Sequence, residues 1–373
     1  MKILADQNMP LVEQYFAEFG EVVRFDGRNV RAEQLQDVDI LLTRSVTKVD
    51  EALLAHANKL QFVGTATIGI DHIDTELLNA RHIAFSNAPG CNAIAVAEYV
   101  ISSLYALCQE NAMSLTGKTI GIVGLGSIGS CLQAKLSALD VKLLLCDPPK
   151  SERGELVEHT EFDDLLADSD IVTFHVPLVK QGPHSTLHML NKARLQALKP
   201  GMIVINASRG DVIDNKALLE VMQQGAELDL VLDVWENEPS ILTDLLDYVR
   251  FASVHIAGHT LEGKARGTQI LYQKVCELKG MCATKSLTDF LPKVNVSAAS
   301  IADNFTNDDV GRLVHLIYDV RRDNGILRRL LASEGFDSLR KNYPPRREFS
   351  TLTVKTEGAT HAQLAALGFR INE

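Results

Sequence analysis

The sequence predicts an α/β protein built on doubly wound parallel sheets, with a smaller C-terminal region of a different pattern. The chain has 373 residues, too many for one ordinary hydrophobic core, so two or three domains are expected. Short apolar runs alternate with stretches of helical apolar spacing, as in a parallel sheet covered by helices. From Leu287 onward this pattern changes.

A strand–helix–strand unit that ends at Asp147 is the clearest element. Thr119–Val123 is an apolar run, Gly124-Leu125-Gly126 predicts a turn, and Ser127–Leu139 has the apolar spacing of a helix. A second apolar run, Val141–Cys146, predicts the next strand. The GxGxxG motif therefore stands where dinucleotide-binding proteins carry it.

Each part of this motif has a separate expected role. Gly124 makes the turn, Gly126 lets the backbone approach a pyrophosphate, and Gly129 lets helix and strand pack closely. The helix N-terminus at Ser127 and Ile128 offers N–H groups and a positive dipole end to the phosphates. The alternative is that the glycines serve only to pack a helix on a sheet.

Asp147 is expected to select the cofactor. An acidic residue at this point bonds a ribose 2′-hydroxyl and repels a 2′-phosphate, which favours NAD over NADP. An Asp before Pro148-Pro149 also suits a plain turn, and this alternative stays open.

Composition excludes several classes of protein. No apolar run approaches the length of a bilayer span, and the N-terminus resembles no cleavable signal, so we expect a soluble, cytoplasmic protein without a membrane partner. A net charge of −11 disfavours nucleic acid as a partner. The six cysteines lack metal-ligand spacing, and Asp71-His72-Ile73-Asp74 is more typical of a helix start than of a metal site. No metal is expected.

A cationic turn, Arg44-Ser45-Val46-Thr47-Lys48, follows the predicted strand Asp39–Thr43. Ligands bind at the carboxyl ends of strands in open α/β sheets, so this turn is a candidate anion site. The alternative is a Ser or Thr cap on a helix that begins near Asp50. Another strand leads into the small-residue turn around Thr67, where a ligand can come close.

Arg209, Glu238 and His255 each follow a predicted strand in the second half of the chain. Strand ends on one edge of a parallel sheet converge, and these three residue types suit hydride transfer from an alcohol carbon. The histidine takes the hydroxyl proton, the carboxylate orients it, and the arginine binds a substrate carboxylate. Taken singly, they also fit a surface ion pair, a turn and a core histidine.

Five motifs in one order, GLGSIG, HVPL, NASRGDVID, DVWENEP and VHIAGHT, resemble the D-isomer-specific 2-hydroxyacid dehydrogenases over about residues 1 to 280. The resemblance implies Arg209 as substrate binder, Glu238 as partner of the histidine and His255 as acid/base. It also implies two Rossmann-like or flavodoxin-like domains. Residues 1–95 and 259–285 would form a discontinuous substrate-binding domain around an NAD-binding domain at 96–258.

Further segments, among them RSVTK, FVGTAT, GHTLEGKARGT and the tail YPPRREFS, are similar to one branch of this family over nearly the whole chain. That branch oxidises a small phosphorylated 2-hydroxy acid of four carbons on the route to pyridoxal 5′-phosphate. It implies a homodimer held by a small α+β domain at 286–373. The implied substrate residues are Arg44, Ser45, Thr67 and His259, the last replacing a frequent Tyr. The implied cofactor residues, besides the glycine motif, are Asp147, His175, Ala207, Ser208, Asp233 and Gly258.

Two alternatives to this activity stay open. One is a 3-phosphoglycerate dehydrogenase, whose substrate is one carbon shorter. The other is an NAD-sensing corepressor, although such a sensor needs no acid/base pair. Arg346 and Arg347 offer a contact to a neighbouring phosphate, but the favoured interpretation is a solvated surface pair.

Overall fold

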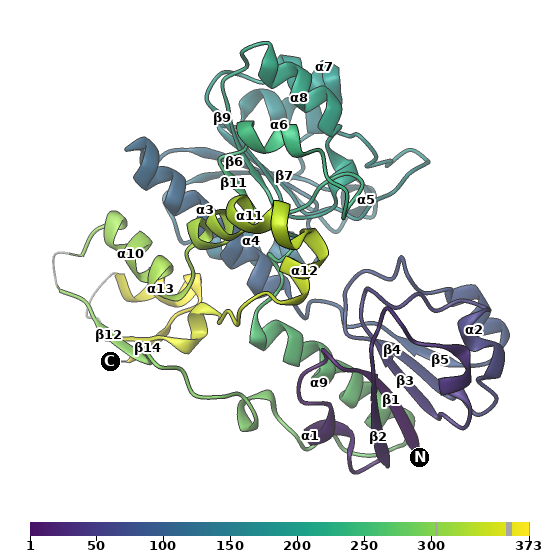
Figure 1. The fold of residues 1–373 in the computed structure, drawn as a ribbon. Coiled ribbons are helices and arrows are strands. Elements are labelled where there is room, and N and C mark those ends of the chain that lie inside the picture. The colour runs from purple at the N-terminus through teal and green to yellow at the C-terminus, as the bar shows by residue number, and fades with distance from the viewer. Residues whose placement is uncertain (303–304, 356–359, 373) are drawn as a thin grey trace. The chain divides into compact units, whose positions relative to one another are not determined.

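The structure is a computed structural model that describes residues 1–302, 305–355 and 360–372. The chain forms two compact units, one from residues 1–92 and 260–293 and the other from residues 93–259 and 294–373. Each unit has its own parallel sheet, labelled in Figure 1. The predicted α/β class with doubly wound parallel sheets is confirmed.

The first unit contains five parallel strands in the order β2-β1-β3-β4-β5. They are β1 (Lys2–Asp6), β2 (Glu21–Phe25), β3 (Ile40–Thr43), β4 (Phe62–Thr65) and β5 (Ala84–Ser86). Its helices are α1 (Val12–Phe16), α2 (Thr75–Ala80) and α9 (Leu261–Leu278), with 3₁₀ turns η1 (Ala32–Leu35), η2 (Leu53–His56) and η5 (Leu287–Asp289).

Successive residues of these strands enter two different cores. Ile3 and Ala5 of β1 pack with α9 on one face, while Leu4 between them packs on the other face. Because side chains of a strand alternate between faces, an uninterrupted apolar run requires cover on both sides. Helix α9, which comes after the six-stranded sheet in sequence, packs on one of these faces. The first unit is therefore formed from two separate stretches of the chain.

The second unit contains six parallel strands in the order β11-β10-β9-β8-β6-β7. They are β6 (Thr119–Val123), β7 (Lys142–Cys146), β8 (Ile171–Phe174), β9 (Met202–Asn206), β10 (Leu228–Leu232) and β11 (Phe251–Ala252). Its helices up to residue 259 are α3 (Ala93–Asn111), α4 (Ser127–Leu136), α5 (Pro148–Glu152), α6 (Phe162–Asp168), α7 (Lys192–Ala197) and α8 (Asn215–Gln223), with turns η3 (Gly210–Val212) and η4 (Thr243–Tyr248).

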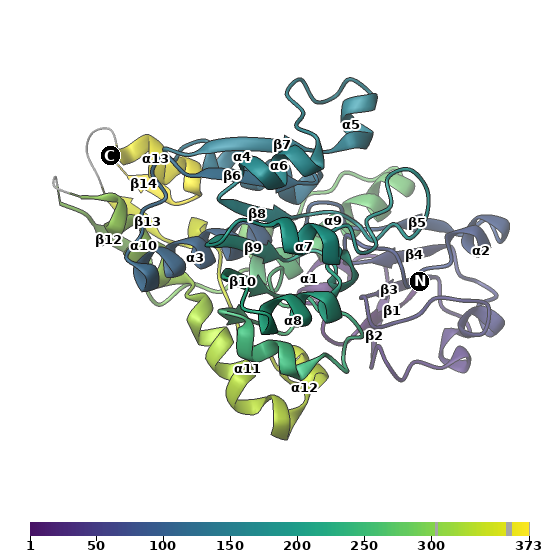
Figure 2. The same cartoon turned by 90° about the horizontal axis from the view of Figure 1, so that it is seen from above.

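Helices cover both faces of the six-stranded sheet. Figure 1 shows α3 and α4 on one side of the strands and α6, α7 and α8 on the other, and Figure 2 shows the same unit from above. Helix α4 ends three residues before its predicted end at Leu139, because the chain turns there with a hydrogen bond from the Leu139 N–H to the Leu136 carbonyl.

The C-terminal segment of this unit adds a small parallel sheet, β12-β13-β14, and four helices among its described residues. They are β12 (Ala298–Ser300), α10 (Asn307–Ile317), α11 (Val320–Glu334), α12 (Phe336–Lys341), η6 (Phe349–Thr351), β13 (Thr353–Lys355), α13 (Thr360–Leu367) and β14 (Arg370–Asn372).

The apolar faces of this segment pack within the same chain. Val310 and Val314 of α10 and Leu327 of α11 are buried in the core shared with α3. The interpretation of Arg346-Arg347 as a solvated pair is wrong for Arg346, whose side chain is 2% exposed and donates hydrogen bonds to the carbonyls of Ala257 and Ala95. Its guanidinium also lies 3.6 Å from the centre of the Tyr318 ring.

Candidate active site

The glycine loop has the geometry that a dinucleotide pyrophosphate needs. Gly124 adopts φ +91°, and a Cβ there would lie 2.6 Å from the His175 carbonyl oxygen. A Cβ at Gly129 would lie 1.9 Å from the Gly124 carbonyl oxygen, so the helix can approach the strand only without one. At Gly126 a Cβ meets no protein atom within 4 Å. The loop is therefore open on the side that would face a ligand.

Helix α4 begins at this opening. Gly126 is its N-cap and provides no side-chain cap, so the first N–H groups of the helix remain available. The sequence between Gly126 and Gly129 places Ser127 and Ile128 in this first turn. These N–H groups and the helix dipole suit the negative charge of a phosphate.

Asp147 makes two local hydrogen bonds, and these leave its predicted ribose contact open. One carboxylate oxygen accepts a hydrogen bond from the Leu125 N–H at 2.8 Å, and the other accepts from the Lys150 N–H at 3.0 Å. Asp147 is thus the N-cap of α5 and also braces the glycine loop. Each oxygen keeps a second lone pair, so a ribose hydroxyl can still be bound.

His175 follows β8 directly and lies against the glycine loop. Burial lowers the pKa of His175 to about 3, so the ring is neutral at physiological pH. Its Nε2 is 2.9 Å from the Thr173 hydroxyl, whereas its Nδ1 is buried without a hydrogen-bond partner among the described residues. A neutral ring with one unsatisfied nitrogen fits a polar contact to a cofactor.

Arg209, Glu238 and His255 follow three neighbouring strands that end at the same level. Leu232, the last residue of β10, is in register with Asn206 at the end of β9 and with Ala252 at the end of β11. Each functional side chain lies shortly beyond one of these ends. The sheet therefore brings the three residues to one edge.

Glu238 and His255 contact each other directly. The His255 Nδ1–H donates to Glu238 Oε2 at 2.8 Å, and the Trp235 N–H donates to Glu238 Oε1 at 3.0 Å. Burial alone would raise the pKa of Glu238, but the hydrogen bond and charge of His255 outweigh it and hold the pKa below its ordinary value. An ionised Glu238 leaves His255 Nε2 as the nitrogen available to exchange a proton.

Asp233 is buried beneath the loop that carries His255. Its Oδ1 accepts hydrogen bonds from the Ser253 hydroxyl and the Ile256 N–H, both at 2.7 Å, and its Oδ2 accepts from the Ala257 N–H at 2.9 Å. Its burial raises its pKa, against the charge of His255 and these donors. The family resemblance implied Asp233 as a cofactor residue, and in the structure its carboxylate supports the loop that carries His255.

Arg209 stands on a turn shaped by Asn206. The Asn206 side chain donates to the Arg209 carbonyl at 2.9 Å and accepts from the Ser208 N–H at 3.0 Å and the Ser208 hydroxyl at 2.8 Å. Ala207 and Ser208 are buried in this turn, and Arg209 is partly exposed. An Asn at the end of a strand often stabilises the following turn through its side chain. Asn206 could therefore have been predicted from the sequence to hold this turn.

The other predicted substrate residues lie in the first unit. Thr43 and Thr65 are in register at the ends of β3 and β4, so Arg44 and Ser45 share a sheet edge with Thr67. The Thr67 hydroxyl donates to the Gly69 carbonyl at 2.9 Å and lies 2.8 Å from the Thr65 hydroxyl.

No hydroxyl of the 44–48 turn caps the following helix. The expected helix near Asp50 is the short 3₁₀ turn η2, and Asp50 itself accepts from the Leu53 N–H at 3.1 Å. The Thr47 hydroxyl donates instead to the Gly27 carbonyl at 3.0 Å.

His259 is the last residue of the 93–259 segment of the second unit and directly follows Gly258. Its ring centre lies 6.1 Å from that of Tyr343 in an edge-to-face arrangement, and its backbone N–H donates to the Ile256 carbonyl at 2.7 Å. The histidine present in place of a frequent Tyr is therefore packed on a tyrosine from the C-terminal segment.

Sequence reasoning missed a second histidine–carboxylate group. His188 Nε2 is 2.6 Å from Glu236 Oε1, and Asp214 Oδ2 is 3.8 Å from His188 Nδ1. The three side chains have the spacing of metal ligands, but Asp214 caps α8 and Glu236 accepts from the Asn215 N–H at 2.7 Å. These hydrogen bonds explain why the three side chains lie together: they stabilise the start of α8. His72, in the segment considered for metal, lies 2.9 Å from the Thr65 hydroxyl.

The chain is similar over its length to proteins named erythronate-4-phosphate dehydrogenase. It is 72% identical over 371 residues to the erythronate-4-phosphate dehydrogenase of Pseudoalteromonas translucida, covering 100% of both chains. It is 48% identical over 371 residues to that of Proteus mirabilis, covering 99% of both. Residues 100–260 match the family model of the D-isomer specific 2-hydroxyacid dehydrogenase NAD binding domain, and residues 290–368 match a domain of unknown function.

Solved structures share the fold at lower identity. An NAD⁺-bound 3-phosphoglycerate dehydrogenase of Entamoeba histolytica has a TM-score of 0.64 at 22% identity, over 75% of this chain and 95% of that one. A protein of Thermus thermophilus, TT0316, has a TM-score of 0.63 at 23% identity, over 75% and 98%. No helix within residues 1–302, 305–355 and 360–372 is both long and apolar enough to cross a bilayer.

The glycine loop, the Glu238–His255 pair and the relatives that match the chain over its length all indicate the same family of dehydrogenases. The chain belongs to the erythronate-4-phosphate dehydrogenase family, a branch of the NAD-linked D-isomer-specific 2-hydroxyacid dehydrogenases.

Proposed function

We propose that this enzyme oxidises 4-phospho-D-erythronate to (R)-3-hydroxy-2-oxo-4-phosphooxybutanoate with NAD, as a step in the synthesis of pyridoxal 5′-phosphate. The observation that carries the proposal is the 2.8 Å hydrogen bond between His255 and Glu238, at the same edge of the sheet as the glycine loop. The names of the full-length relatives support the choice of substrate.

The residues of the second unit would perform the chemistry in the following way. Bound NAD supplies the hydride acceptor. His255 Nε2 takes the proton of the C2 hydroxyl as the hydride leaves C2, and Glu238 stabilises the imidazolium that results. Arg209 binds the substrate carboxylate and polarises the nascent carbonyl. Gly126 and the first turn of α4 would hold the pyrophosphate, and Asp147 and His175 would contact the nucleoside part.

We assign the recognition of the substrate phosphate to the first unit, with His259 as a further contact from the second. Arg44 offers a charge and Ser45 a hydroxyl at the end of β3, and Thr67 offers a hydroxyl at the end of β4. Arginine and hydroxyl groups are common ligands of phosphate.

His255→Asn tests the acid/base assignment. We expect turnover to fall by about 10²-fold or more, because general acid–base catalysis contributes roughly that factor, while NADH still binds. NADH binding is followed by fluorescence titration of the variant. Normal turnover in His255→Asn would overturn the assignment.

We also retain the homodimer and the cytoplasmic location as predictions from the sequence. Leu316 on α10 is 51% exposed and Val296 is 48% exposed, so apolar surface of the C-terminal segment is available for a second copy. Sedimentation equilibrium of the purified chain measures this directly. A monomer at micromolar concentration would contradict the dimer.

A further inference from the structure

We propose that the C-terminal segment, residues 294–372, positions the acid/base histidine through two arginines, Arg340 and Arg346. Both hold the backbone of the histidine loop, which we define as Ser253–Ala257. This inference rests on the proposed function of His255. It assigns a role to a region whose family model describes a domain of unknown function.

The histidine loop needs external support because its backbone is strained. His255 adopts φ +57°, in the left-handed region that residues with a Cβ rarely occupy. Such a conformation is energetically unfavourable and persists only where surrounding contacts determine it. The position of the imidazole therefore depends on what holds the loop.

Part of this support comes from below, within the six-stranded sheet. The His255 N–H donates to the Asp233 carbonyl at 2.7 Å, and the Asp233 carboxylate binds the next two N–H groups of the loop. The Ser253 hydroxyl donates to Asp233, so it can only accept from the Tyr99 hydroxyl at 2.9 Å. This network holds the N–H side of the loop.

The C-terminal segment holds the carbonyl side. Arg340 Nε of α12 donates to the His255 carbonyl at 3.2 Å, and one terminal nitrogen of Arg346 donates to the Ala257 carbonyl at 3.0 Å. The other terminal nitrogen of Arg346 donates to the Ala95 carbonyl at 2.6 Å in α3. Arg346 thereby joins the histidine loop to a helix of the core.

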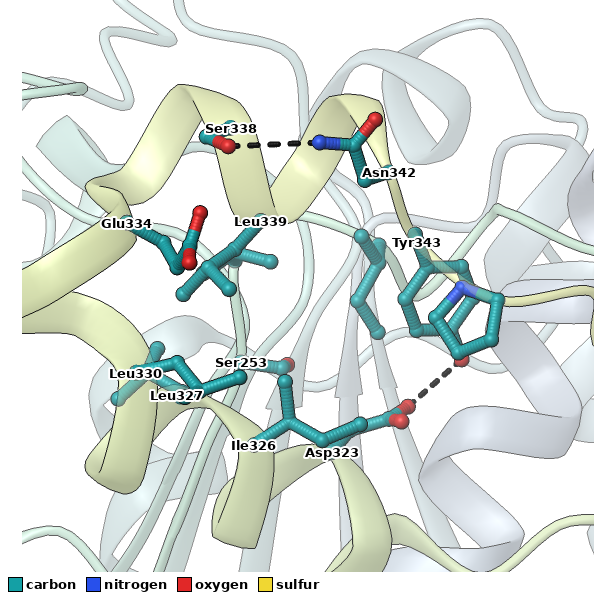
Figure 3. A pocket seen from close by; sticks show the side chains of 13 residues that line it. Ser253, Asp323, Ile326, Leu327, Leu330, Glu334, Ser338, Leu339, Asn342 and Tyr343 are labelled. Carbon is teal, nitrogen blue, oxygen red and sulfur yellow. Dashed lines mark hydrogen bonds between the residues drawn. The ribbon is translucent and has the colours of Figure 1, made fainter.

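Packing alone does not fix the loop from this side. A cavity of about 280 Å³ is lined by Ser253, Val254 and Ile256 together with residues of α11 and α12, so the packing between them is not complete. Figure 3 shows Leu327 and Leu330 of α11 and Leu339 of α12 around this cavity, with Asp323 bonded to Tyr343. Because apolar contact is incomplete here, directional hydrogen bonds from Arg340 and Arg346 carry more of the positioning.

Arg340 also acts on the partner of the histidine. Its charge is among the influences that lower the pKa of Glu238, so it favours the ionised carboxylate that accepts from His255. The segment therefore bonds to the backbone of His255 and also influences the charge state of Glu238.

The test compares Arg346→Lys, Arg346→Met and Arg340→Met with Arg329→Met, an exposed arginine of α11 that serves as the matched control. A displacement near 1 Å costs on the order of 10²-fold in rate. We expect kcat to fall roughly 10- to 100-fold in Arg346→Met and in Arg340→Met, with the Kd for NADH unchanged. Arg346→Lys should retain an intermediate kcat, because an ammonium keeps the charge but lacks the planar fork.

A kinetic isotope effect separates positioning from mere loss of folded enzyme. With substrate deuterated at C2, slower hydride transfer raises the isotope effect on kcat, whereas a smaller folded fraction leaves it unchanged. We expect a larger isotope effect in the Arg340 and Arg346 variants than in the wild type and Arg329→Met. If Arg346→Met does not fold, Arg340→Met at its partly buried position carries the test.

The outcomes separate the two proposals. Wild-type kcat and isotope effect in the arginine variants, together with an inactive His255→Asn, would overturn this inference and leave the proposed function standing. A His255→Asn variant with normal turnover would overturn the proposed function itself.

Discussion

Glu238 Oε2 lies 2.8 Å from His255 Nδ1, and the two residues stand 17 positions apart on loops that follow adjacent strands. The carboxylate can only accept in this hydrogen bond, so the proton of a neutral His255 is on Nδ1. Nε2 then has a free lone pair and is the basic atom of the site.

Replacing this carboxylate should separate catalysis from binding. Glu238→Gln keeps the shape but presents an amide that stabilises no imidazolium, so we expect kcat to fall by about 10²-fold with little change in the Kd for NADH. Steady-state kinetics and fluorescence titration measure the two quantities. Glu236→Gln, which removes a carboxylate bonded to His188, is the matched control and should keep near wild-type kcat. Equal effects of the two changes would contradict the account.

Asp147 provides a test of cofactor choice. Asp147→Asn keeps an oxygen for one of the N–H groups of Leu125 and Lys150 but removes the charge that repels a 2′-phosphate. We expect the ratio of kcat/KM for NAD to that for NADP to fall at least about tenfold, roughly 1.4 kcal/mol of discrimination. An unchanged ratio would show that the charge of Asp147 does not select the cofactor.

Two glycines of one loop should respond differently to the same change. Gly126→Ala meets no protein atom within 4 Å, so we expect an unchanged Tm and weaker NADH binding. Gly129→Ala places its Cβ 1.9 Å from the Gly124 carbonyl oxygen, so the backbone must shift and Tm should fall by several degrees. Calorimetry and NADH titration of both variants check this contrast. Undiminished NADH binding in Gly126→Ala would argue against a pyrophosphate at this position.

Glu98 should make stability decrease as pH rises. Burial raises the pKa of Glu98 from 4.5 to about 8, outweighing the charge of Lys135 at 3.5 Å. Between these two pH values the unfolded chain loses this proton and the folded chain keeps it, so ΔG of unfolding falls as pH rises, by on the order of 1 kcal/mol per pH unit at most. Above about pH 8 both states are ionised and this contribution becomes constant.

Glu98→Gln isolates this effect because the amide oxygen can still accept from the Phe349 N–H. Urea unfolding from pH 5 to 9 should show wild-type stability declining relative to the variant up to about pH 8. If the free energy of unfolding had the same pH dependence in both proteins, Glu98 could not be the source of the decline. His175 makes the free energy of unfolding change with pH in the opposite direction. Both proteins contain His175, so its contribution cancels in the comparison.

Local patterns sufficed for much of the fold and part of the site. Thr119–Val123 and Met202–Asn206 are strands over the predicted residues, and Gly124, Gly126 and Gly129 have the expected environments, because each depends on a few neighbouring residues. The edge shared by Arg209, Glu238 and His255 followed from the rule that parallel strands end together.

Contacts distant in sequence were beyond such patterns. Arg346 bonds Ala257 and Ala95, which are 89 and 251 positions away, so nothing near residue 346 distinguishes it from a surface arginine. The burial of Val310 and Val314 against α3 is likewise a tertiary event, since an amphipathic helix has the same spacing whether it packs within its chain or on a partner.

The most direct test of the proposed activity is a comparison of substrates and cofactors on the purified enzyme. Values of kcat/KM are measured for 4-phospho-D-erythronate and 3-phospho-D-glycerate, each with NAD and with NADP. We predict clear preference for the four-carbon acid with NAD. A preference for 3-phospho-D-glycerate, or no turnover with either acid, would contradict the assignment.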